Sequence, residues 1–259
     1  MSPAGALALK LVLTPILVGA ASLAGRRWGS AVGGWLIGIP FTSGPIAFFL
    51  ALSPGPRFAA EAALGIMAGA ISQAAFCLAY AWTAQRSTWI ASMLAATAAF
   101  SAATITLNPL RIPGLAFLAV VAVVLVIALF LMPRRSETTA EHLDFPRWDI
   151  PARMVVATAF VVALTSAAPL LGPRLAGLLA PFPLYGAVLA TFAHRLQGRE
   201  PAVNVLRGLL LGLFAFASFF LVLAVLLPEG IAPAFALAIV AAAGVQAGSL
   251  VTGRRLGLA

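Results

Sequence analysis

The stretch GGWLIGIPFTSGPIAFFL, residues 33–50, combines the hydrophobicity of a membrane-spanning segment with residues that interrupt helices. Its centre carries two prolines and three small or polar residues, namely Pro40, Thr42, Ser43, Gly44 and Pro45. In a bilayer, backbone groups that a proline frees must find partners in protein or in cavity water. We therefore expect an interrupted helix here that is buried in protein or lines a water-filled path.

The composition of the whole chain is that of an integral membrane protein. Hydrophobic residues make up 62% of the 259 positions and charged residues only 9%, with a mean hydropathy of +1.06. A water-soluble protein could not cover so much apolar surface. The sixteen basic residues are scattered singly or in pairs between apolar segments, without the basic stripe of a nucleic-acid-binding protein. The expected partner is the lipid bilayer, and no nucleic acid.

Nine apolar segments predict an all-α polytopic bundle with about nine transmembrane helices. Each segment has close to the roughly 20 residues that a helix needs to cross a bilayer. The predicted spans are 5–25, 31–52, 58–83, 88–107, 113–132, 153–171, 175–194, 202–227 and 231–251.

The chain also resembles itself at a shift of 143 residues, which indicates an internal duplication. Without a gap, this shift pairs residues of uncommon types as well as the abundant alanines and leucines, for example Gly29 with Gly172, Pro40 with Pro183, and Gly69 with Gly212. We expect a first four-helix repeat in residues 1–110, a linker helix and cytoplasmic loop in 111–152, and a second repeat in 153–259. The linker helix, 113–132, has no counterpart and is expected at the periphery.

The distribution of basic residues predicts that the two repeats have opposite orientations. When the loops are assigned alternately to two sides, one side holds only Lys10, Arg57, Arg111 and Arg174, and the other twelve basic residues fall on the second side. The positive-inside rule places that second side in the cytoplasm. We therefore expect a multi-pass protein of the inner (plasma) membrane, with the N-terminus outside and the C-terminus in the cytoplasm. Inverted repeats of this kind recur in secondary transporters.

Two short motifs at equivalent places, GWLIGIPF at 34–41 and GLLAPFPLYG at 177–186, resemble the GlpM-like family of small four-helix inner-membrane proteins. In both motifs a glycine leads into a second helix broken by proline and aromatic residues. The resemblance covers residues 5–107 and 153–251, and implies two such units fused in one chain. Small proteins of this character are expected to insert in both orientations and to pair antiparallel. The resemblance implies no activity and no catalytic residues.

The candidate site lies where the two repeats interrupt their second helices at corresponding depths. Such paired interruptions are the best sequence indication of a transporter site. The expected substrate-binding residues are Pro40, Thr42, Ser43, Gly44, Gln73, Pro183, Tyr185 and Gln246. The alternative is that the breaks are kinks at a symmetric packing interface, and that the two glutamines form interhelical hydrogen bonds.

Two further sets of residues have structural interpretations. Lys10 and Glu61 are expected near the same membrane edge, where they form an ion pair or extend separately toward water. The sequences GIMAG at 65–69 and GLLLG at 208–212 place small residues four apart, as in close helix–helix contacts.

These features favour a secondary transporter or facilitator for a small neutral or weakly polar solute. The alternatives are a narrow ion or small-solute channel, whose selectivity would come from hydroxyls and helix ends, and a non-transporting membrane scaffold or assembly protein. Nucleotide-binding loops, hydrolase elbows and zinc-protease motifs are absent from the sequence. We therefore expect no enzymatic activity, no metal and no cofactor.

Overall fold

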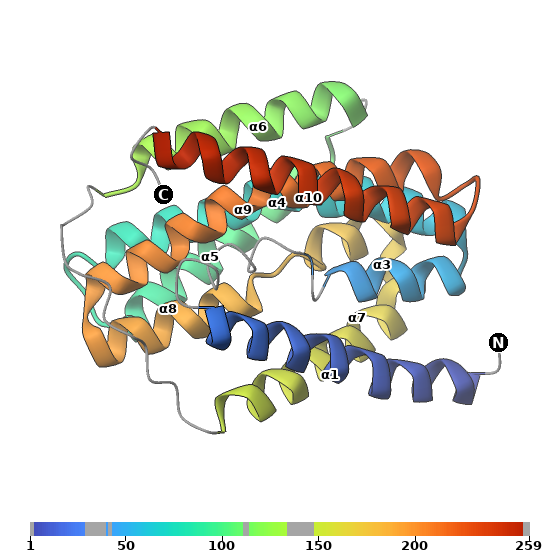
Figure 1. The fold of residues 1–259 in the computed structure, drawn as a ribbon, viewed down its shortest axis with the longest axis horizontal. Helices are drawn as coiled ribbons and strands as arrows, with labels where there is room; N and C mark the ends of the chain where they lie inside the picture. The colour runs from blue at the N-terminus through green and yellow to red at the C-terminus, as the bar shows by residue number, and fades with distance from the viewer. Residues whose placement is uncertain (1–2, 29–39, 41–42, 111–113, 134–147, 256–259) are drawn as a thin grey trace.

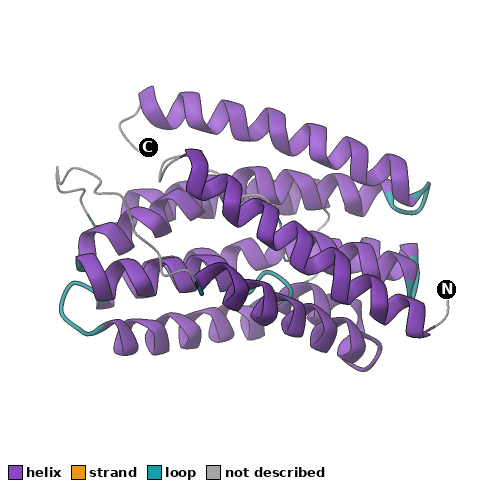
Figure 2. Ribbon diagram, turned by 60° about the horizontal axis from the view of Figure 1, so that its bottom comes forward, coloured by secondary structure: helices purple, strands orange, loops and turns teal. Residues whose placement is uncertain are grey.

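The structure of the chain is a computed structural model in which all regular structure of the described residues is α-helical (Figures 1 and 2). It describes residues 3–28, 40, 43–110, 114–133 and 148–255. The helices are α1 (Pro3–Trp28), α3 (Ser43–Leu52), α4 (Pro56–Thr83), α5 (Trp89–Leu107), α6 (Gly114–Leu131), α7 (Asp149–Leu179), α8 (Leu184–Gln197), α9 (Arg199–Leu226) and α10 (Ile231–Arg255). The prediction of an all-α fold is confirmed.

Six of these helices contain a stretch that is long and apolar enough to cross a membrane, among the residues that the structure describes. The stretches are Pro56–Thr83, Trp89–Leu107, Gly114–Leu131, Ile150–Leu179, Arg199–Leu226 and Ile231–Ser249. Shorter apolar helices lie at Leu7–Ile16 and Ser43–Leu52. The lengths and compositions fit a multi-pass membrane protein.

Most helix boundaries follow from local sequence signals. Pro56 starts α4 directly after Gly55, whose φ of 139° an L side chain rarely adopts. The side chain of Thr88 accepts a hydrogen bond from the backbone N–H of Ala91 and so caps α5. Gly198, with φ of 94°, separates α8 from α9. Notably, α9 begins and ends 143 residues after α4 begins and ends, so both helices have 28 residues.

One pair of predicted spans is divided differently in the structure. The sequence predicts separate spans at 153–171 and 175–194, but helix α7 continues past the first of these to Leu179. Gly172 makes a kink inside α7, with φ of 75° and ψ of 163°, between Pro169 and Pro173. Glycine tolerates this backbone conformation, so the chain changes direction there and resumes helical structure for one more short segment. The predicted seventh span therefore consists of the end of α7, an interruption and α8.

Helices α4 and α9 form the centre of the bundle and run in opposite directions. The first residue of α6, Gly114, lies between Leu64 near the start of α4 and Leu221 near the end of α9. At the other end of α6, the indole Nε1 of Trp82, near the end of α4, donates a hydrogen bond of 2.9 Å to the carbonyl oxygen of Leu131. Close to this end, Arg207, near the start of α9, donates to the carbonyl oxygen of Pro133 at 2.6 Å.

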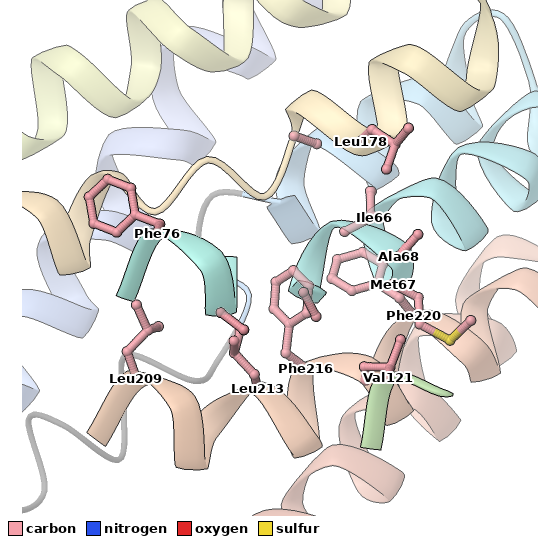
Figure 3. Packing of buried hydrophobic residues seen from close by; sticks show 14 of the residues in the cluster. Ile66, Met67, Ala68, Phe76, Val121, Leu178, Leu209, Leu213, Phe216 and Phe220 are labelled. Carbon is pink, nitrogen blue, oxygen red and sulfur yellow. The ribbon is translucent and has the colours of Figure 1, made fainter. Parts of the chain in front are cut away.

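The core around α4 is apolar and tightly packed (Figure 3). Figure 3 shows Ile66 of α4 beside Leu178 of α7, while Leu213 and Phe216 extend from α9 toward α4. Helix α6 contributes only one buried face to this core, which consists of Phe117, Val121, Leu125, Ala128 and Leu129. Its other faces are exposed, which confirms the expectation that the linker helix is peripheral.

Two arginines of the second half of the chain bind carbonyl groups at the ends of helices in the first half. Arg174 donates to the carbonyl oxygens of Leu107 and Asn108 at the end of α5. Arg199 donates to the carbonyl oxygen of Gln85, after α4, at 3.0 Å. Cationic donors stabilise the unpaired carbonyls at helix C-termini. These bonds show that basic residues also join the two halves of the chain, and the contact of Arg207 at Pro133 joins α9 to the segment that follows α6.

Candidate functional site

Helix α3 begins in the interior of the bundle rather than at its edge. Residue Pro40 is buried and non-helical, and helical structure begins at Ser43. The ten residues of α3 then span about 15 Å, which is half of a 30 Å hydrocarbon core. The expectation that Pro45 also interrupts the helix is wrong. Pro45 lies in the first turn of α3, where its missing N–H would have had no helical partner anyway.

A second interruption follows the end of α7. Ala180 is the C-cap of α7, and α8 starts at Leu184 after Pro181, Phe182 and Pro183. Short backbone hydrogen bonds hold this turn, from Phe182 N to the Leu179 carbonyl at 3.1 Å and from Leu184 N to the Phe182 carbonyl at 2.8 Å. The interruption predicted around Pro183 is therefore present.

The two interruptions contact each other. The hydroxyl of Ser43 donates a hydrogen bond of 3.0 Å to the carbonyl oxygen of Ala180, and both residues are buried. Of the expected binding residues, Pro40, Ser43, Gly44 and Pro183 thus belong to two segments that meet. We call Pro40, Ser43 and Gly44, together with residues 180–183, the crossing.

Glycines on α4 bring the end of α7 close to that helix. The Cα of Gly177 lies so near α4 that a methyl group there would collide with the carbonyl oxygen of Ala62. A methyl group at Gly65 would lie 2.7 Å from the carbonyl oxygen of Arg174, and one at Gly69 would collide with Pro181. The small-residue face predicted at 65–69 is confirmed as a packing surface, and its partner is the segment that leads into the crossing.

Gln73 lies on the same face of α4, one turn after Gly69. Its side chain is 4% exposed. A helical side chain leans toward the N-terminus of its helix, so that of Gln73 leans toward the turn of Gly69 and hence toward Pro181. One turn further on, Phe76 contacts the ring of Phe182, with the centroids 6.2 Å apart. The structure therefore places Gln73 beside the crossing, at the middle of α4.

Phe182 anchors the crossing in an aromatic cluster that the sequence did not indicate as part of the site. Its ring lies 5.3 Å from that of Phe100 on α5 and 6.5 Å from that of Phe160 on α7, both measured between centroids. Aromatic pairs at such distances add to the energy of burial. The cluster fixes the interruption between α7 and α8 against three helices.

Tyr80 and His194 form a second polar contact further along the same face of α4. The hydroxyl of Tyr80 lies 3.4 Å from Nδ1 of His194 on α8, and Tyr80 is fully buried. Sequence reasoning did not single out Tyr80, because a tyrosine in an apolar segment is usually a packing residue. Its spacing of seven residues from Gln73 places both side chains on one side of α4.

Other predicted residues lie elsewhere or outside the described part. Gln246 is buried at 3% exposure on α10, which packs along α9 at the opposite side of the bundle from α7 and α8 (Figure 1). The structure therefore does not bring it to the crossing. Thr42 lies outside the described residues. Tyr185 belongs to the first turn of α8, and the structure describes its backbone only.

Lys10 and Glu61 have different surroundings. The Nζ of Lys10 lies 5.7 Å from the centroid of the Phe49 ring on α3, as in a cation–π contact. The side chain of Glu61 is exposed on α4. The ion pair between them stays a prediction.

Ligand groups for a metal do not gather in the described part of the chain, where no three His, Cys, Asp or Glu side chains form a cluster. Cys77 is free and buried. Comparisons of the chain with protein-family models, with curated proteins and with solved structures found no match.

Proposed function

We propose that this protein is a secondary transporter or facilitator that moves a small polar solute through a site at the crossing. The observation that carries this proposal is the buried hydrogen bond between Ser43 and Ala180, which joins two interrupted segments in the interior of the bundle. Irregular backbone inside a membrane protein is tolerated where it is buried in protein or lines a path for water and solutes. Transporter sites are typically formed by discontinuous helices near the bilayer midplane.

We further propose that residues 1–110 and 153–259 are inverted repeats. Three observations support this: the 143-residue shift in the sequence, the same shift between the bounds of α4 and α9, and the opposite directions of these two helices. The single linker helix α6 makes the number of membrane crossings between the starts of the two repeats odd. The second repeat would therefore insert in the opposite orientation. The resemblance of each half to the GlpM-like family stays part of this proposal, as does a plasma-membrane location with the N-terminus outside.

Flux measurements on proteoliposomes test the proposed function. Purified protein is first screened by thermal unfolding against small metabolites, and each compound that stabilises it is then used in radiolabelled form for uptake. A transporter gives saturable uptake that is accelerated by unlabelled solute inside the vesicles. Flux that never saturates would instead indicate a channel. Protein that mediates no flux of any solute would contradict both functions and favour a scaffold.

Two variants connect flux to the crossing. Ser43→Ala and Gln73→Leu are expected to reduce uptake, whereas Ser101→Ala, an exposed hydroxyl on α5, serves as the matched control and should leave it unchanged. Equal uptake by all three variants would place the solute path elsewhere.

A further inference from the structure

Two helices begin at the crossing and direct their N-termini into the interior of the bundle. Helix α3 has ten residues and starts at Ser43, and α8 has fourteen residues and starts at Leu184. The N-terminus of a helix carries roughly half a positive charge, together with N–H groups that have no partner within the helix. In an apolar interior such charge is screened much less than in water.

The first turn of α8 retains free donors, whereas in α3 the N–H of Gly44 donates to the carbonyl of Pro40 and Pro45 has no N–H, so α3 contributes the partial charge of its N-terminus. At the start of α8, Leu184 N donates to Phe182, and Ala187 N donates to the carbonyl of Pro183 at 2.7 Å. Between them, the N–H groups of Tyr185 and Gly186 donate to no backbone carbonyl of the described residues. The structure thus offers adjacent backbone donors at an interior helix end, which is the usual form of an anion site.

Gln73 provides an independent indication of a ligand at this place. Its side chain is more than nine-tenths buried, and it makes no hydrogen bond to any described residue. It lies on the face of α4 whose Gly69 meets Pro181, and helix geometry directs it toward that turn. A buried amide normally has hydrogen-bond partners, because leaving its donors and acceptor unpaired costs free energy. An NH2 group that faces the crossing would complete the set of donors.

The sequence places no acidic residue where it would compete for these donors. The seven acidic residues of the chain all lie outside the central parts of the predicted spans. The side chains alone favour a neutral solute, because no arginine or lysine lies at mid-span either. Helix ends add positive potential that a count of charged residues does not include.

We propose, building on the proposed function, that the solute carries a single anionic group, a carboxylate, which binds between the N-termini of α3 and α8 and the amide of Gln73. Two partial charges and neutral donors match one negative charge. A doubly charged phosphate would require a full cationic partner, and no arginine or lysine stands at the middle of a predicted span.

The test compares matched acids and amides. Purified protein is titrated with sodium lactate and with lactamide, and with sodium propionate and propionamide, at constant ionic strength and pH 8, while the unfolding temperature is recorded. The carboxylates are expected to raise it saturably, and the carboxamides and inorganic phosphate are not. Gln73→Leu is expected to weaken carboxylate binding about tenfold to a hundredfold, the range for a hydrogen bond to a charged group.

A variant that supplies its own carboxylate makes the test independent of the choice of probe. Gln73→Glu places an anion beside both helix ends, so its unfolding temperature is expected to equal or exceed that of the parent protein, and its response to carboxylates to disappear. Gln246→Glu is the matched control. It introduces a carboxylate at a similarly buried amide on α10, away from both helix ends, and should lower the unfolding temperature.

The outcomes separate this inference from the proposed function. Stabilisation by the carboxamides as large as that by the carboxylates, with saturable flux of a neutral solute, would overturn the anionic site and leave the transporter in place. Destabilisation by Gln73→Glu as severe as that by Gln246→Glu would also overturn it. An absence of saturable flux for every solute would count against the proposed function itself.

Discussion

The hydroxyl of Ser43 donates a hydrogen bond to the carbonyl oxygen of Ala180, 137 residues away in the chain. The donor is in the first residue of a helix, and the acceptor is in the last turn before an interruption. Loss of this bond would leave a carbonyl buried without this partner and remove a contact between the two halves of the chain.

Ser43→Ala is therefore expected to lower the free energy of unfolding by about 0.6 to 1.7 kcal/mol, the range for hydrogen bonds between transmembrane helices. Thermal unfolding in detergent, followed by tryptophan fluorescence, measures the change. Ser101→Ala on the exposed face of α5 removes the same hydroxyl and should have no effect. If both variants unfold at the same temperature, the bond does not contribute to stability.

Gly177→Ala is expected to destabilise the protein more strongly than Ser43→Ala. A methyl group there meets backbone atoms of Ala62 and Gly65, which cannot move like a flexible side chain. Overpacking of this kind costs about 1 to 3 kcal/mol. Gly244→Ala is the control, because nothing lies within 4 Å of its new methyl group. It should stabilise α10 by up to about 1 kcal/mol. Equal effects of the two variants would contradict the close approach of α4 and α7.

Gly172→Ala tests the kink in α7 separately from packing. Nothing lies within 4 Å of the added methyl group, but the φ of 75° and ψ of 163° form a conformation almost restricted to glycine. We expect a loss of about 1 to 3 kcal/mol in the free energy of unfolding. A stability unchanged from the parent protein would mean that α7 is not kinked at this residue.

Much of this fold follows from the sequence, because hydrophobic length and glycine or proline positions determine where helices start and end. The sequence predicted α4 and α6 to within two residues at each end. It could not assign Pro45 to the first turn of α3, since a proline at that position and one inside an interruption leave the same local pattern. The positions of Gln73 and Gln246 were equally indistinguishable, because both are single amides in apolar helices. Only the tertiary contacts of Gly69 and Phe76 place Gln73 beside the crossing.

The orientation of the chain is tested by labelling single cysteines in a Cys77→Ala background. A membrane-impermeant maleimide added to intact cells should label Pro109→Cys and leave Ala140→Cys unlabelled until the cells are opened. This result follows from the excess of basic residues on the side that contains position 140. The opposite pattern would reverse the assigned topology.

The solute path is tested most directly by cysteine accessibility at position 43. In Cys77→Ala proteoliposomes that carry Ser43→Cys, a small water-soluble methanethiosulfonate reagent is applied from one side of the membrane and then from the other. If the crossing lines a path with alternating access, the cysteine reacts from both sides, and the transported solute slows the reaction in proportion to occupancy. A cysteine that stays unreactive from either side, with flux intact, would show that the two interruptions form a packing contact and that the solute passes elsewhere.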